Sequence, residues 1–176
     1  MKELVSILMI GISLSMDTFS LSLSIGSISQ AKRLKIIPFV VGIFHFFMPI
    51  LGNLLGLKLI TIFNLTGHIL LGLILISLAI NLALHYFKDE KIDIKLNLIG
   101  ILIFAFSVSF DSFTVGMGIN AITEKYLIAS TIFAVCSACF TYLGILIGKY
   151  SSKLIGKSAN LIGIIILFLL GIFHLF

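Results

Sequence analysis

The stretch SMDTFSLSLSIG, residues 15–26, places a carboxylate, Asp17, in the middle of a long apolar run. A second stretch, SFDSFTVGMGIN at residues 109–120, repeats the pattern 94 residues later, with Asp111 in the place of Asp17. The residues that recur around the acid are Ser15, Phe19 and Ile25 in the first copy and Ser109, Phe113 and Ile119 in the second. A charged side chain at the centre of a membrane helix costs about 2.5 to 3.5 kcal/mol. The presence of two such charged residues therefore indicates that the aspartates have a function.

The composition is that of a polytopic membrane protein and excludes an ordinary soluble domain. Of 176 residues, 60% are hydrophobic and 11% are charged, and the mean hydropathy is +1.25. The net charge of +5 does not indicate nucleic-acid binding, because the twelve Lys and Arg residues fall in short tracts between apolar runs. Lipid headgroups account for these tracts better. Two cysteines inside one apolar run, Cys136 and Cys139, predict neither a disulfide framework nor a zinc site.

Six apolar segments are long enough to cross a bilayer as helices. We expect an all-α integral membrane protein forming one transmembrane domain over residues 1–176, with spans at 4–26, 38–57, 65–87, 96–119, 126–147 and 158–176. The charged loop 88–95 separates a first repeat, 1–87, from a second, 96–176. Two GxxxG pairs predict close helix packing in the second and fifth spans: Gly52 with Gly56, and Gly144 with Gly148.

The basic residues predict the orientation in a bacterial plasma membrane. Nine Lys and Arg residues lie in the odd-numbered loops, which follow the first, third and fifth spans, and three lie on the opposite side of the membrane. The positive-inside rule then places the odd-numbered loops in the cytoplasm and both termini outside. Three spans separate the two aspartate motifs, so the two repeats of three spans run in opposite directions. Inverted repeats of this kind are common in secondary transporters, whose sites lie near the membrane midplane.

Helical spacing puts two hydroxyl side chains on the same helix face as each aspartate. The candidate metal ligands are therefore Asp17 with Ser13 and Ser20, and Asp111 with Ser107 and Thr114. Two carboxylates neutralise one divalent cation, and hydroxyl and carbonyl oxygens suit Mg²⁺, Ca²⁺ or Mn²⁺. After the cation leaves, two adjacent carboxylates cannot both stay ionised, so at least one takes a proton. This predicts exchange of a transported cation for protons, with no resident cofactor.

Four further side chains are secondary candidates for the site. His45 matches Cys139 at the same offset of 94, so both could line the pathway, although a hydrogen-bonded His and a packing Cys are ordinary alternatives. Met16 and Met117 lie beside the aspartates as soft thioether ligands or as fillers of apolar gaps. Pro49 lies inside the second span and removes one helical hydrogen bond there. Two intramembrane amides have no assigned role, Asn81 and Asn160.

The two aspartate motifs resemble those of the MntP-type manganese efflux pumps of bacteria. The segment FFMPILG, residues 46–52, looks like the Met-Pro-x-x-Gly segment of that family's second span. The resemblance covers nearly the whole chain and implies export of Mn²⁺ from the cytoplasm, with Asp17 and Asp111 as the main metal-binding residues. A sporulation-associated branch of related membrane proteins resembles the chain nearly as well.

Two other classes of protein are alternatives to a transporter. An intramembrane aspartyl protease also uses two aspartates on different spans, but its Gly-x-Gly-Asp signature is missing, since Ile119 follows Gly118. A structural membrane protein could use the aspartates only to hydrogen-bond between helices. The sequence favours a transporter, not an enzyme, with a divalent cation and protons as substrates and the lipid bilayer as its surroundings. It leaves the oligomeric state open.

Overall fold

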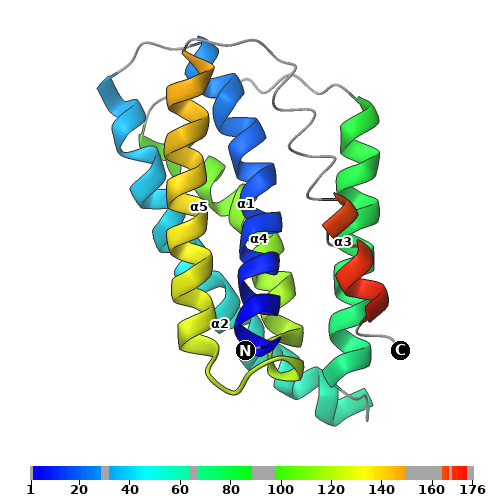
Figure 1. Cartoon of the computed structure of the whole chain (residues 1–176). Coiled ribbons are helices and arrows are strands. Elements are labelled where there is room, and N and C mark those ends of the chain that lie inside the picture. The colour runs from blue at the N-terminus through cyan, green and yellow to red at the C-terminus, as the bar shows by residue number, and fades with distance from the viewer. Residues whose placement is uncertain are drawn as a thin grey trace.

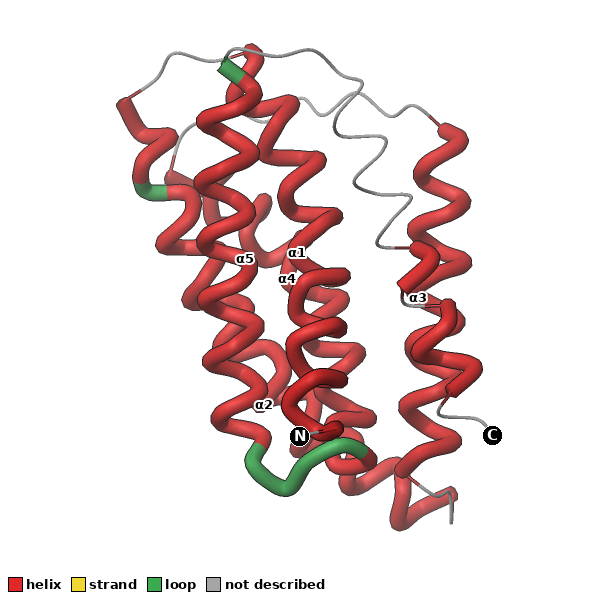
Figure 2. Tube along the Cα trace, in the orientation of Figure 1, coloured by secondary structure: helices red, strands yellow, loops and turns green. Residues whose placement is uncertain are grey.

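The structure is a computed structural model, and the residues that it describes are 2–28, 32–63, 67–88, 98–149, 164–166 and 168–173. These residues are almost entirely helical (Figure 2). The elements are α1 (Lys2–Ile28), η1 (Lys32–Lys35), α2 (Ile37–Phe63), α3 (Gly67–Lys88), α4 (Leu98–Gly118), η2 (Ile119–Ala121) and α5 (Tyr126–Gly148). A shorter apolar helix follows at Ile164–Phe173.

Four of the helices are long and apolar enough to cross a membrane. Their apolar spans are Glu3–Leu23 in α1, Ile37–Leu59 in α2, Leu98–Ala121 in α4 with η2, and Tyr126–Gly148 in α5. This confirms the all-α membrane class and the first, second, fourth and fifth predicted spans as candidates. The third predicted span coincides with helix α3, but that α3 crosses the membrane remains a prediction. Most of the charged loop 88–95 and about half of the sixth span lie outside the described residues.

The helices associate in two pairs, α1 with α5 and α2 with α4, and contacts between α2 and α5 join the pairs. Figure 1 shows that α1 and α5 run upward from the end of the molecule marked N, whereas α2 and α4 run downward. The two aspartate motifs therefore lie on helices of opposite direction. Helix α3 packs against α4 and η2. Each pair joins one helix from residues 1–87 to one from residues 96–176.

In the α1–α5 pair, two glycines of α5 allow the helix backbones to approach closely. A Cβ atom at Gly144 would lie 2.7 Å from the carbonyl oxygen of Phe19, and one at Gly148 would overlap the carbonyl of Leu23. Neither position can hold a larger side chain without moving a backbone. The GxxxG pair in the fifth span therefore serves the close packing that the sequence predicts.

The α2–α4 pair repeats this arrangement. A Cβ atom at Gly52 would overlap the carbonyl oxygen of Phe113, and one at Gly56 would overlap that of Met117. Phe113 and Met117 stand 94 residues after Phe19 and Leu23, so the same two motif positions receive glycines in both pairs. The GxxxG prediction is confirmed for the second span as well.

Apolar side chains form two main clusters at different heights in the bundle. The first cluster contains Leu14, Val115 and Phe133, together with Leu71 of α3. The second cluster draws its residues from α1, η1, α2, α4 and α5, among them Ile25, Val41, Val108 and Ile145. Because α1, α4 and α5 each contribute to both clusters, the stretches between them on these helices lie at the middle of the bundle.

An amide pair ties α2 to the end of α4. The Nδ2 group of Asn120 donates a hydrogen bond to Oδ1 of Asn53, and Asn53 is 3% exposed. A buried amide without its partner pays the cost of desolvation. This bond therefore helps to hold α2 against η2, and the two elements are in contact.

Replacing Asn53 by alanine is expected to lower the free energy of unfolding by about 1 to 3 kcal/mol, because the amide of Asn120 loses its acceptor. Thermal unfolding in detergent measures the change. Thr61→Ala on the same helix is the control, since its hydroxyl forms an exposed bond to the carbonyl of Leu57 and its loss should change little. Equal stability of the two variants would contradict the assignment.

Candidate functional site

Nine polar side chains of the described residues are fully buried in the bundle, and we call them the polar layer. Its members are Ser13, Ser15, Thr18, Ser22, His45, Ser109, Ser112, Ser137 and Thr141. They come from α1, α2, α4 and α5, the four helices that are candidate membrane spans. A layer of buried polar groups inside an apolar bundle is costly unless it is hydrogen-bonded or serves a function.

On α1, the aspartate motif lies between the two apolar clusters. Leu14 belongs to the first cluster and Ile25 to the second. Asp17 and Thr18 stand one helical turn after Leu14, and helical spacing places them on either edge of the stripe that faces the core. Thr18 is fully buried and Asp17 is half-buried. The carboxylate thus lies at the margin of the polar layer.

The aspartate motif of α4 has the same placement. Val108 belongs to the second cluster and Val115 to the first, and Asp111 and Ser112 stand between them. Ser112 is fully buried and Asp111 is half-buried, as at the corresponding positions of α1. Helices α1 and α4 also contact each other directly. The structure therefore places both aspartates on neighbouring helices, between the same two clusters.

Two buried contacts inside the layer link the helices of each pair. The hydroxyls of Ser15 and Ser137 are 3.2 Å apart, and the Oγ atom of Ser109 is 2.8 Å from Nδ1 of His45. Ser15 and Ser109 occupy the same motif position, so their partners His45 and Ser137 correspond as well. The match of His45 with Cys139 from the sequence is therefore wrong, and Cys139 is exposed.

The physical reason is a difference in the length of the connection between helices. Gly52 and Gly144, which make corresponding contacts, are 92 residues apart, whereas Asp17 and Asp111 are 94 apart. The chain from the aspartate to the first glycine of the GxxxG pair is two residues shorter in the second half, 33 residues instead of 35. A comparison of the two halves at one constant offset misses such a deletion, whereas the distance along the chain between the two GxxxG pairs reveals it.

His45 is held in one orientation by its neighbours. Its Nδ1 atom lies 3.1 Å from the carbonyl oxygen of Val41, which can only accept a hydrogen bond. A hydrogen bond to that carbonyl requires the proton on Nδ1, which leaves the lone pair of the ring on Nε2; in the other tautomer Nδ1 accepts from the hydroxyl of Ser109. Nε2 is buried and has no hydrogen-bond partner among the described residues. The hydroxyls of Thr18, Ser22 and Ser112 share this condition.

The predicted hydroxyl ligands are placed unequally. Ser13 is buried and donates to the carbonyl of Met9, at 2.8 Å, and Thr114 is half-buried and donates to that of Phe110, at 3.1 Å. A hydroxyl that donates in this way keeps lone pairs for a cation. Ser20 is half-buried, whereas Ser107 is exposed.

The secondary candidates other than His45 lie among apolar groups or outside the described part. Met16 packs against Phe19 and Leu23, and Met117 packs against the first apolar cluster. Asn160 and the side chain of Asn81 lie outside what the structure describes. Within the described ranges, no group of three or more His, Cys, Asp and Glu side chains is close enough to hold a metal ion. Hydroxyl and carbonyl oxygens would have to supply most of any ligand shell.

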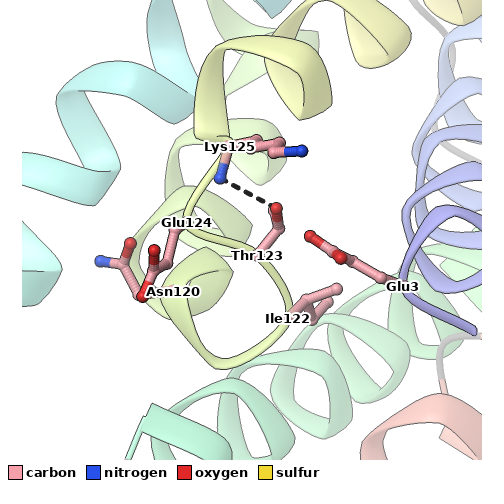
Figure 3. A pocket seen from close by; sticks show the side chains of 6 residues that line it. All are labelled: Glu3, Asn120, Ile122, Thr123, Glu124 and Lys125. Carbon is pink, nitrogen blue, oxygen red and sulfur yellow. Dashed lines mark hydrogen bonds between the residues drawn. The ribbon is translucent and has the colours of Figure 1, made fainter.

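A shallow hollow of about 330 Å³ opens at the end of the bundle where α1 begins. Figure 3 shows the carboxylate of Glu3 pointing from α1 toward Thr123, whose hydroxyl accepts a hydrogen bond from the backbone N–H of Lys125. Glu124 and Asn120 line the same hollow. The carboxylates of Glu3 and Glu124 thus lie at the helix ends, whereas those of Asp17 and Asp111 lie within the spans.

The fold and the site define a polytopic membrane protein with one aspartate on each of two candidate spans, α1 and α4. A family profile described as "Mntp: Putative manganese efflux pump" matches residues 28–175. Three relatives are each described as "Putative manganese efflux pump MntP": one from Oceanobacillus iheyensis, 34% identical over 177 residues, one from Bacillus thuringiensis, 29% over 178, and one from Bacillus cereus, 29% over 177. Each alignment covers 99% of this chain and 97% of the relative. The chain belongs to this family of membrane manganese efflux pumps. No solved structure matches it.

Proposed function

We propose that the protein is a secondary transporter that exports divalent cations, Mn²⁺ above all, from the cytoplasm in exchange for protons. The observation that carries the proposal is the position of Asp17 and Asp111, one on each of two contacting helices, between the two apolar clusters. Two carboxylates at that depth match the charge of one divalent cation. Family membership supports a transporter over a protease or a structural protein.

The two halves of the chain act as inverted repeats in this proposal. The antiparallel directions of α1 and α4 support it, and so do the corresponding glycine contacts in the α1–α5 and α2–α4 pairs. The distribution of Lys and Arg favours cytoplasmic odd-numbered loops and extracytoplasmic termini. A site at the interface of such repeats can open to each side of the membrane in turn.

The aspartates supply the charge of the site, and hydroxyls supply neutral oxygens. We assign Ser13, Ser20 and Thr114, but not the exposed Ser107, as the hydroxyl ligands. Carbonyl or water oxygens complete the shell, because hard divalent cations take six or more oxygen ligands. When the cation leaves, repulsion between the carboxylates and their poor hydration favour uptake of a proton. The proton then leaves when the next cation binds, which couples the two fluxes.

Transport by the purified full chain in proteoliposomes tests the proposal. With an inward-directed Mn²⁺ gradient, we expect Mn²⁺ uptake together with proton efflux, measured by a trapped metal-sensitive dye and a trapped pH dye. Mg²⁺ and Ca²⁺ in place of Mn²⁺ report the selectivity. Liposomes with protein that take up no more Mn²⁺ than empty ones would favour a structural role. Uptake without proton movement would remove the exchange mechanism.

A further inference from the structure

We infer that Nε2 of His45 is a nitrogen ligand of the transported cation, in the polar layer between the two helix pairs. The inference rests on the proposed function and adds a residue that sets the preference among cations. Its starting point is that His45 is fully buried in the bundle, with Nδ1 beside Ser109 and Val41 and with Nε2 unpartnered among the described residues.

The hydrogen bonds of His45 are those of a metal-binding imidazole. A ligating histidine usually donates its other ring N–H to a carbonyl or carboxylate, which orients the ring and makes the ligating nitrogen more basic. Here the carbonyl of Val41 fills that role, 3.1 Å from Nδ1. The lone pair of Nε2 then faces the interior without a donor among the described residues. Leaving such a group unpaired inside the bundle is costly, so its retention calls for a partner.

The backbone of His45 points to the same role. Pro49 follows four residues later inside α2 and has no N–H, so the usual helical donor to the carbonyl of His45 is missing. One residue thus brings an imidazole nitrogen and a carbonyl oxygen that lacks its regular helical partner. In membrane proteins such backbone groups are tolerated where they line a cavity or an ion site.

The surroundings of His45 are suited to a passing cation. Thr18, Ser22 and Ser112, on α1 and α4, are also fully buried members of the polar layer, and their hydroxyls have no hydrogen-bond partner among the described residues. The described residues hold no group of three or more metal-binding side chains. In this conformation His45 can therefore act beside at most one other acid, Cys or His of the described residues, and hydroxyl, carbonyl and water oxygens would complete the shell.

A nitrogen ligand would change the selectivity of the site. Mg²⁺ and Ca²⁺ prefer oxygen ligands, whereas first-row transition metals accept imidazole. The corresponding position in the other helix pair is Ser137, so only one side of the layer carries an imidazole. His45 would thus let the protein bind Mn²⁺ and similar cations in preference to Mg²⁺.

Pulsed electron paramagnetic resonance of the Mn²⁺-loaded full chain in lipid nanodiscs tests the inference. We expect a nitrogen hyperfine coupling to Mn²⁺ that changes isotope pattern when the protein is labelled with ¹⁵N-histidine. The coupling should disappear in His45→Asn, whose amide can keep the bonds made by Nδ1. It should persist in His85→Asn, the same substitution near the end of α3. Absence of the histidine coupling in the wild type would overturn the inference whether or not any variant folds.

Binding measurements on the same samples supply a second readout. His45→Asn should weaken Mn²⁺ binding about tenfold, equivalent to about 1.4 kcal/mol, with Mg²⁺ binding unchanged. An equal loss for both cations would indicate a structural role and overturn the inference. If Asp17→Asn and Asp111→Asn stop transport while Mn²⁺ shows no histidine coupling, the proposed function stands and the role of His45 falls. If the wild type binds no Mn²⁺, both fail.

Discussion

Replacing Asp111 by asparagine is expected to reduce Mn²⁺ transport at least about 100-fold, beyond the 10- to 100-fold effect typical of groups around a metal ligand. Asparagine has nearly the same shape and keeps one oxygen, but it removes the negative charge that balances the cation. It also removes the group that would carry the exchanged proton. Asp17→Asn should have an effect of the same size, because the two residues occupy corresponding places on α1 and α4. Uptake into proteoliposomes measures both.

Folding should not limit this experiment. A neutral amide is less costly than a carboxylate inside a membrane helix, so both variants should reach wild-type levels in the membrane. Glu124→Gln is the matched control, since it makes the same acid-to-amide change in the exposed loop between α4 and α5 and should leave transport unchanged. If Asp17→Asn and Asp111→Asn both transported Mn²⁺ at the rate of this control, the site would have to lie elsewhere.

Replacing Gly52 by alanine is expected to destabilise the protein by at least about 3 kcal/mol, at the upper end of overpacking costs. The added methyl group would overlap the carbonyl oxygen of Phe113, which belongs to a helix backbone and cannot rotate away. Helices α2 and α4 would have to separate, and packing drives helix association in a membrane because lipid is as apolar as leucine. Unfolding in detergent or a loss of folded protein in the membrane would report the change.

Two other glycines make this prediction specific. Gly144→Ala should have a smaller effect, since the new Cβ atom would lie 2.7 Å from the carbonyl oxygen of Phe19. Gly42→Ala should be nearly neutral, because the closest atom is Cβ of Ala138 at 3.2 Å and alanine favours the helix. The expected order of damage is Gly52, then Gly144, then Gly42. A neutral Gly52→Ala would mean that α2 and α4 do not pack in this way.

The positions of the helices could be predicted because membrane thickness sets the length of an apolar segment. Helix α5 covers 126–148 where the prediction has 126–147, and α4 covers 98–118 where it has 96–119. Helix α2 continues to Phe63, six residues past the predicted end, because it runs through the single exposed charge of Lys58 into the further apolar residues LITIF. Hydropathy detects where apolar residues stop, not where backbone hydrogen bonds stop.

The candidate site could be predicted in part. Asp17 and Asp111 stand out in any reading of the sequence because a charge in an apolar span is rare. Helical spacing predicts Ser107 as a ligand, but the structure has it exposed, since spacing alone does not tell which face of a helix meets its neighbours. The pairing of His45 with Ser109 depends on a contact between residues 64 positions apart. No local pattern contains such a contact.

By itself, the sequence determined that this is a helical membrane protein with a carboxylate in each of two apolar spans, because hydropathy and charge act locally along each span. Only the tertiary structure decided that α1 packs on α5 and α2 on α4, and that His45 corresponds to Ser137. Lipid surrounds every span alike, so apolar character cannot select partners between spans. Packing partners are instead selected by shape, here by the glycines that let particular helix backbones approach each other. Whether two helix surfaces fit together is seen only once the helices are assembled.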